Sequence, residues 1–241
     1  MGQYYTLINI SKRQLLPTFT FEGNQIVFDQ FTTGAKMVEQ LYDLGNKPFL
    51  AMGLTELNSA GSANPIAPIG NWSGDRIVLI GDYCDDLPPF LTVAECNELQ
   101  AAGSKNLSSF ANKHYSPLAK RDFLKDNVGQ EFDRLFPRDS ETYHLVLNLD
   151  KKEFLDPRKF HESTTFVNEF ALKADGIMQS LYALIFYSTG SGGGDVQEFK
   201  QGRWAGNHIT IREKERVSDL ESWDDISEHM AETLNDVMER E

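Results

Sequence analysis

The chain contains little cysteine: Cys84 and Cys96 are its two thiols among 241 residues. Two thiols do not make a disulfide framework, so we expect a reducing, cytoplasmic environment. No uninterrupted apolar run reaches the length needed to cross a bilayer, and the N-terminus lacks the basic segment and apolar core of a secretory signal. The sequence therefore predicts a soluble protein. Residues 1–6, MGQYYT, match a short myristoylation template, but the two tyrosines begin an expected strand, and the sequence leaves open whether Gly2 is modified.

Basic residues are also scarce relative to acidic ones. The chain has 23 Lys and Arg against 36 Asp and Glu, a formal net charge of −13. Nucleic acid and anionic membranes would both be repelled, so neither is expected as a partner. The composition fits a freely soluble protein, or one that meets a basic protein partner. With 40% hydrophobic residues, the chain has enough apolar surface to fill a core.

Strong catalytic signatures are missing as well. The five histidines show no spacing typical of metal ligands, no serine or cysteine occupies a nucleophile elbow, and Cys84 and Cys96 do not form a C-x-x-C pair. No metal site or cofactor is therefore assigned, and whether the protein is an enzyme stays open.

What the sequence does contain is an internal repeat. Residues 4–16, YYTLINISKRQLL, align with residues 143–155, YHLVLNLDKKEFL, which places Asn9 over Asn148. Residues 70–77, GNWSGDRI, align with residues 202–209, GRWAGNHI. Two aligned blocks in the same order indicate a duplication, with a first repeat over 1–138 and a second over 139–241.

Each repeat predicts the same order of elements. A hairpin comes first, then an amphipathic helix, a Gly-rich loop, a strand that follows the Gly-x-Trp-x-Gly turn, and a closing helix. The expected ranges are 4–16, 31–44, 58–70, 77–80 and 116–135 in the first repeat, and 143–155, 166–185, 188–202, 209–211 and 223–237 in the second. Residues 84–115 form an insertion that we expect to be a surface loop with one short helix. The predicted fold class is α+β, with two tandem related halves, each a small antiparallel sheet with packed helices, arranged as a pseudo-twofold pair.

Some of the repeated residues also carry a family resemblance. The opening MGQYY with Asn9, and the block W-S-G-D-R-I at 72–77 followed by G-D-Y at 81–83, resemble a group of small microbial and fungal proteins. Those proteins begin with an MGQYY-like strand and carry a G-x-W-x-G-D-R-I…G-D-Y motif, often with a GGGD-like loop. The group has no settled activity, so the resemblance implies an outline of the fold and no chemistry.

The motif set of this group is divided between the two repeats. The first repeat keeps Gly74-Asp75-Arg76 and Gly81-Asp82-Tyr83, whereas the second keeps the glycine run that ends at Asp195. One hypothesis is that single-copy relatives form twofold dimers and that this chain fused the pair. A composite site would then need Asp75 and Asp195 close together.

Asp75 and Arg76 are the first candidate site residues. The carboxylate could hold a metal or act as a base, and the guanidinium could bind an anion. The simpler interpretation is that Asp75 caps its own turn, since Asn207 aligns with it and has a similar shape. Asp82, with two further acids at 85 and 86, could bind a divalent cation, but the spacing fits no known calcium loop, and a solvated loop is favoured.

The loop 189–195 and the two tryptophans complete the candidates. The loop ends in Asp195 and could bring amides to a phosphate, but it has no Walker lysine, and a flexible connector is favoured. Trp72 and Trp204 could stack on a ligand, although a buried plug with its N–H bonded is favoured.

Two functions follow from these residues. The first hypothesis is a non-enzymatic binding or scaffold protein, with a protein partner or self-association. The alternative is a ligand-binding protein or metal-assisted enzyme with a site at the Asp75, Arg76 and Asp82 face. The tentative ligand-binding residues are Trp72, Asp75, Arg76, Asp82, Trp204 and Asp195.

Overall fold

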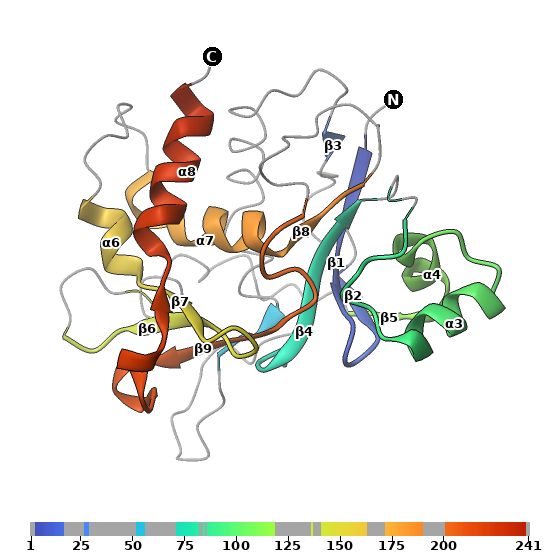
Figure 1. Ribbon diagram of the computed structural model, residues 1–241, viewed down its shortest axis with the longest axis horizontal. Helices are drawn as coiled ribbons and strands as arrows, with labels where there is room; N and C mark the ends of the chain where they lie inside the picture. The colour runs from blue at the N-terminus through green and yellow to red at the C-terminus, as the bar shows by residue number, and fades with distance from the viewer. Residues whose placement is uncertain are drawn as a thin grey trace.

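A computed structural model describes the chain over residues 3–16, 27–28, 52–55, 71–81, 84, 86–118, 136, 141–162, 172–189 and 201–239. These residues form a mixed β-sheet with helices packed on it, which confirms the α+β class (Figure 1). None of the helices in this part of the chain has the length and apolar character needed to span a bilayer.

Both predicted hairpins are present. In the first repeat, β1 (Gln3–Asn9) pairs with β2 (Gln14–Leu16), and in the second, β6 (His144–Asn148) pairs with β7 (Glu153–Leu155). Each connecting turn places a basic residue in the left-handed region, with φ of 52° at Arg13 and 53° at Lys152. The two turns therefore share a backbone conformation that few non-glycine residues adopt.

The sheet joins the two hairpins through two long central strands. Its order is β10-β7-β6-β9-β4-β1-β2-β5, and β3 (Val27–Phe28) pairs with β1 beside this path. The central strands are β4 (Asp75–Gly81) and β9 (His208–Glu213), and the edge strands are β5 (Ser116–Pro117) and β10 (Asp224–Asp225). Each half of this order contains the strands of one repeat.

The central strands meet at their starts, in a short pairing that we call the seam. There β4 and β9 are antiparallel, with Arg76 opposite His208. Beyond the seam, each strand pairs with a segment from the other repeat. The strand β8 (Phe186–Tyr187) runs parallel to β4, and the amide of Ile211 donates to the carbonyl of Leu54 over 2.8 Å. The two repeats are thus connected by crossed segments as well as by the seam.

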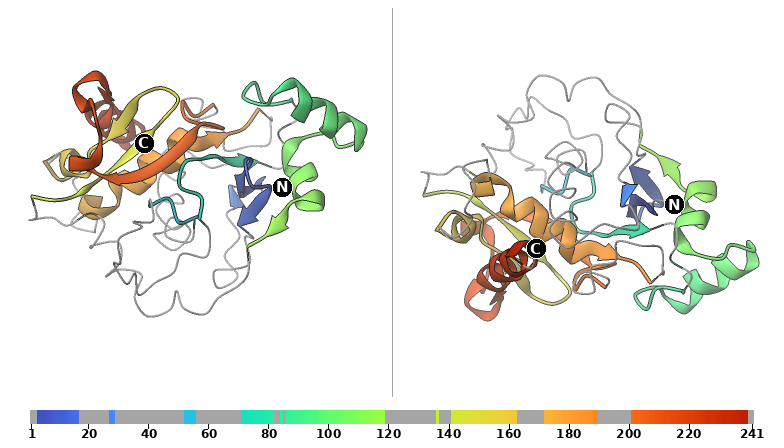
Figure 2. Two further views of the ribbon diagram at one scale, coloured as in Figure 1. Left: turned by 90° about the horizontal axis from the view of Figure 1, so that it is seen from below. Right: turned by 90° about the horizontal axis from the view of Figure 1, so that it is seen from above.

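One face of the sheet carries a core shared by both repeats. Side chains that alternate along the strands, such as Leu7, Leu79, Val146 and Ile211, belong to one buried cluster. Helices α6 (Pro157–Glu162), α7 (Leu172–Ile185) and α8 (Ser227–Glu239) lie together on the side of β6, β7 and β9 (Figures 1 and 2).

The opposite face is covered separately in each repeat. In the first repeat, residues 86–118 form a segment that we call the arm, with α3 (Val93–Ala101) and α4 (Leu107–His114) beside the sheet (Figure 1). Leu107 and Phe110 of α4 are buried against strand residues. The expectation of a surface loop with one short helix over 84–115 was therefore wrong, because the arm contains two helices and contributes to the core.

The helices of the second repeat agree with the pattern except at their ends. The helix α7 includes Gly176, where Phe160 packs so closely that an added Cβ would lie 3.0 Å from its ring. The helix α8 begins at Ser227, so Trp223 and Ile226 of the predicted stripe precede it. The ranges 31–44 and 58–70, and most of 116–135, lie outside the described residues.

Candidate functional site

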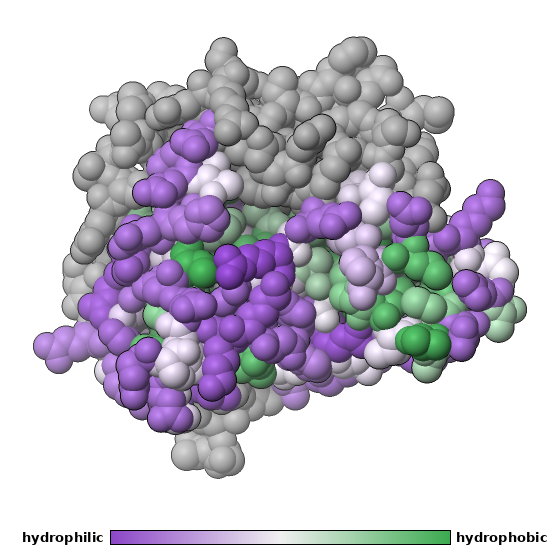
Figure 3. Space-filling view, viewed as in Figure 1, coloured by the Kyte–Doolittle hydropathy of each residue, from purple (hydrophilic) through white to green (hydrophobic). Residues whose placement is uncertain are grey.

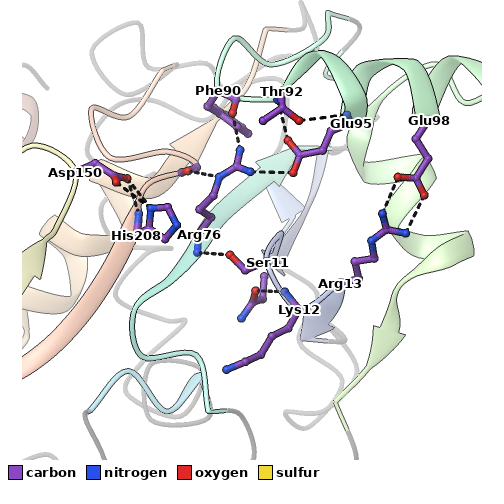
Figure 4. A network of polar contacts seen from close by, with 12 residues as sticks. Ser11, Lys12, Arg13, Arg76, Phe90, Thr92, Glu95, Glu98, Asp150 and His208 are labelled. Carbon is purple, nitrogen blue, oxygen red and sulfur yellow. Dashed lines mark hydrogen bonds and ion pairs between the residues drawn. The ribbon is translucent and has the colours of Figure 1, made fainter.

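Arg76 lies at the centre of the seam and bonds to three groups of its own chain (Figure 4). Its Nε donates to the carbonyl of Gly206 over 3.1 Å, and its Nη2 donates to the carbonyl of Phe90 over 2.5 Å. Its Nη1 forms an ion pair with the Glu95 carboxylate over 2.8 Å. The guanidinium thus connects β4 to the turn before β9 and to the arm, and these bonds use three of its five N–H donors.

The position of Glu95 is fixed by the start of α3. Thr92 caps this helix, and the Glu95 carboxylate accepts from the Thr92 amide over 2.8 Å, completing a capping box. Burial raises the pKa of Glu95, but the bonds from the Thr92 amide and the Arg76 guanidinium outweigh this and hold the pKa below its usual value. The carboxylate is therefore charged at neutral pH, as its pairing with Arg76 requires.

His208 occupies the equivalent place in the second repeat but has different partners. Its backbone amide donates to Asp150 over 2.8 Å, as the Arg76 amide donates to Ser11 over 3.0 Å. The His208 ring nitrogen Nδ1 lies 2.9 Å from an Asp150 oxygen. The His208 side chain is 42% exposed, whereas the Arg76 side chain is 16% exposed.

Asp75 is held by two groups of the first hairpin. Its Oδ2 accepts from Asn9 Nδ2 over 2.8 Å and lies 2.7 Å from Lys12 Nζ. Asn207, the aligned residue, accepts from Asn148 Nδ2 over 3.0 Å. This matched bonding favours a structural role for Asp75, in which it joins the turn before β4 to the hairpin.

Both tryptophans are buried completely. Trp72 and Trp204 have 0% exposure and belong to the shared core. The indole of Trp72 donates to the side chain of Gln14 over 2.8 Å, and that of Trp204 donates to Glu153 over 2.6 Å. The arrangement favours the plug interpretation, since neither ring face is open to a ligand.

The remaining site residues, Asp82 and Asp195, lie outside the described residues. Gly81, which precedes Asp82, ends β4, whereas Asp75 begins it. Six residue steps along a strand separate Asp75 from Gly81 by about 20 Å. Asp75 and Arg76 are therefore adjacent at the seam, and the G-D-Y segment leaves from the other end of the strand.

The far end of β4 carries a second, small group of polar side chains. Cys84 is buried, and its Sγ lies 3.4 Å from the Thr189 hydroxyl. Burial, with smaller contributions from Cys84 and Asp86, raises the pKa of Tyr187 to about 12. Tyr187 is thus neutral near pH 7. Among the residues that the structure describes, no group of three or more His, Cys, Asp or Glu is placed to hold a metal ion.

Sequence reasoning did not identify Ser11, Glu95 or Asp150 as part of the seam. The alignment places Ser11 over Asp150 in the hairpin turns, which was a usable signal. Glu95 gave only the local signal of a capping box after Thr92, and its contact with Arg76 depends on tertiary packing. The chain matches no protein-family model, no curated protein and no solved structure.

Proposed function

We propose that the protein is a binding or scaffold protein built from two fused, related halves, with no catalytic centre at the seam. The observation that carries this proposal is that Asp75 and Arg76 both bond to groups of their own chain. A catalytic pair would need a carboxylate and a guanidinium directed toward a substrate. Here both side chains hold structural elements together.

The fused halves would be the repeats over 1–138 and 139–241, arranged as a pseudo-twofold pair. Bonds across the seam support this part of the proposal because they occur in equivalent pairs. The amide of Gly74 donates to the carbonyl of Ile209, and the amide of Gly206 donates to the carbonyl of Ile77, both over 2.8 Å. Fusion would make the pairing of the halves permanent and allow each outer surface to diverge toward a partner.

Substitution at Asp75 tests the structural role. Asp75→Ala should lower the free energy of unfolding by about 0.5–2 kcal/mol, since it removes the acceptor for Asn9 and Lys12. Asp75→Asn reproduces the bonding of Asn207 and should cost within about 0.5 kcal/mol. Urea denaturation of both variants provides the measurement. An Asp75→Ala variant as stable as the wild type would favour a ligand site instead.

The alternative function, a ligand-binding or metal-assisted site at the Asp75, Arg76 and Asp82 face, predicts a bound cation. Native mass spectrometry before and after a chelator separates the two functions. A bare mass under both conditions supports the binding or scaffold function. An added mass that leaves with the chelator would support the metal-assisted alternative, and the same spectrum shows whether the chain self-associates.

A further inference from the structure

The arm, which lies between β4 and β5 in the first repeat, has no counterpart between β9 and β10 in the second. Residues 82–115 connect β4 to β5, whereas only residues 214–223 connect β9 to β10. These ten residues form two short turns, η4 (Lys214–Arg216) and η5 (Leu220–Ser222). The surface that corresponds to the one beneath the arm is therefore covered by much less chain in the second repeat.

The glycine turns beside the seam differ in the same way. Gly206 is buried, and a Cβ at this position would overlap the ring of Phe90 from the arm. Gly74, its aligned residue, has the same φ of 74° but is half-buried, and no atom of the described residues lies within 4 Å of a Cβ built there. An aromatic side chain thus packs on one turn, whereas no described residue packs on the equivalent position of the other.

Two ion pairs fasten the arm to the first repeat, and their basic positions recur in the second. Glu95 pairs with Arg76 over 2.8 Å, and Glu98 pairs with Arg13 over 2.7 Å. The alignment places His208 over Arg76 and Lys152 over Arg13. Lys152 is exposed, and its side chain has no ion pair or hydrogen bond among the described residues. The second repeat therefore keeps both basic positions, and no acidic helix of the described residues pairs with them as α3 does in the first.

Apolar side chains beside these basic residues are incompletely covered. Leu149, Leu220 and Trp223 are partly buried against the cluster that contains Leu147 and Phe154. Ile10, the residue aligned with Leu149, is buried to 4% exposure in the cluster that the arm covers. On the face shown in Figure 3, hydrophilic residues predominate on the side of the second repeat, and hydrophobic residues gather on the side of the arm.

We propose that this face of the second repeat docks an acidic helix of a partner protein, in the way that the first repeat holds its own α3. The acceptor face consists of Gly74, Leu149, Lys152, His208, Leu220 and Trp223. The partner helix carries an aromatic residue just before its start and two carboxylates one turn apart, as Phe90, Glu95 and Glu98 are arranged in the arm. The aromatic side chain packs at Gly74, and the carboxylates pair with His208 and Lys152.

His208 can accept this pairing while it keeps its present one. Its contacts with Asp150 are made through Nδ1, so Nε2 remains available to a carboxylate from outside. A second copy of this chain is a poor occupant, because its own Glu95 and Glu98 are already paired with Arg76 and Arg13. This inference rests on the proposed binding function and specifies the chemistry of the partner.

The arm itself supplies the probe for a test. A synthetic peptide of residues 86–101, with Cys96→Ser to prevent disulfide formation, contains no tryptophan and is titrated into the full chain. Trp223 is the partly buried tryptophan of the acceptor face, so its fluorescence should change saturably, and Trp223→Phe should remove this signal. Lys152→Glu should weaken binding about fivefold, which matches the loss of an exposed ion pair.

Matched variants identify the site and the occupant. Lys151→Glu changes the neighbouring exposed lysine and should leave binding unchanged, and a peptide with Glu95→Gln and Glu98→Gln should bind more weakly. No signal up to ~1 mM peptide, or binding that Arg13→Glu abolishes and Lys152→Glu does not, would overturn the proposal. Concentration-dependent dimers that Lys152→Glu abolishes would make a second copy the occupant and also overturn it. None of these failures affects the Asp75 and chelator tests of the proposed function.

Discussion

Gly206 and Gly74 have the same left-handed backbone and different surroundings, which makes them a matched pair for substitution. Alanine at either position adds backbone strain of about 1–2 kcal/mol. At Gly206 the new Cβ would also overlap the Phe90 ring, which adds about 1–3 kcal/mol. We expect Gly206→Ala to cost more free energy of unfolding than Gly74→Ala in urea titrations. Equal losses would show that the arm does not pack on this turn.

The partners of the two buried tryptophans differ in charge, and the neighbouring residues differ with them. Glu153 is 3% exposed and also pairs with Arg203, whose side chain is 47% exposed. In the first repeat the aligned residues are Gln14 and Asn71, both uncharged. Each buried indole thus has a side-chain acceptor, which is charged in one repeat and neutral in the other. The charged acceptor needs a neighbouring cation because burying an unpaired carboxylate is costly, whereas the neutral amide does not.

A double-mutant cycle tests whether Glu153 and Arg203 depend on each other. Among the described residues, Arg203→Asn leaves the buried carboxylate with the Trp204 indole as its remaining side-chain donor, and it should cost about 1–3 kcal/mol of unfolding free energy. In a Glu153→Gln background, the same substitution reproduces the first repeat and should cost about 1 kcal/mol less. Urea denaturation of the four proteins gives the coupling. If the losses of unfolding free energy in the two single variants add up to the loss in the double variant, Arg203 does not offset the cost of burying the Glu153 carboxylate.

At the scale of elements, the arm is the segment that the sequence described least well. In α3, Leu99 is the one buried residue, so the helix lacks the apolar periodicity that would have predicted it. Its position is set by ion pairs with Arg13 and Arg76, which lie far from it in the sequence. The hairpins were predictable because their signal is local: a largely apolar run, a polar turn and a following proline.

The ion pair between Glu95 and Arg76 should make the arm sensitive to acid. The pKa of Glu95 is lowered in the folded state, so its contribution to stability is fully present above the usual glutamate pKa, about 4.3, and is lost as the pH falls through the lower folded value. Glu95→Gln should cost about 0.5–1.5 kcal/mol at pH 7, a value reduced by the partial exposure of the pair.

The difference between the wild type and Glu95→Gln should shrink below about pH 4.3. Urea denaturation of both proteins at pH 7, 5 and 3.5 provides the measurement. Glu98→Gln is a suitable comparison, since the Glu98 side chain is 42% exposed and its pair with Arg13 is more accessible to water. A Glu95→Gln penalty that is constant over this pH range would contradict the assigned pairing.

At the scale of the whole molecule, the crossed connections could not be predicted from the sequence. The order of elements within each repeat follows from local patterns, but the choice of partner strand does not. Leu54 pairs beside β9 and Phe186 pairs beside β4, yet both are apolar residues that would fit the strand of either repeat. A repeat predicts two similar units, and only tertiary structure shows that segments of each complete the sheet of the other.

These crossed connections predict that the chain unfolds as one cooperative unit. Trp72 and Trp204 belong to different repeats but to one buried cluster, so neither should become exposed while the other stays packed. In a Trp223→Phe background, Trp72→Phe and Trp204→Phe each leave one buried reporter. In each protein, the urea midpoint from tryptophan fluorescence should coincide with the midpoint from far-ultraviolet circular dichroism. If the two repeats unfolded independently, the midpoints would separate by more than roughly 0.5 M urea in at least one of these proteins.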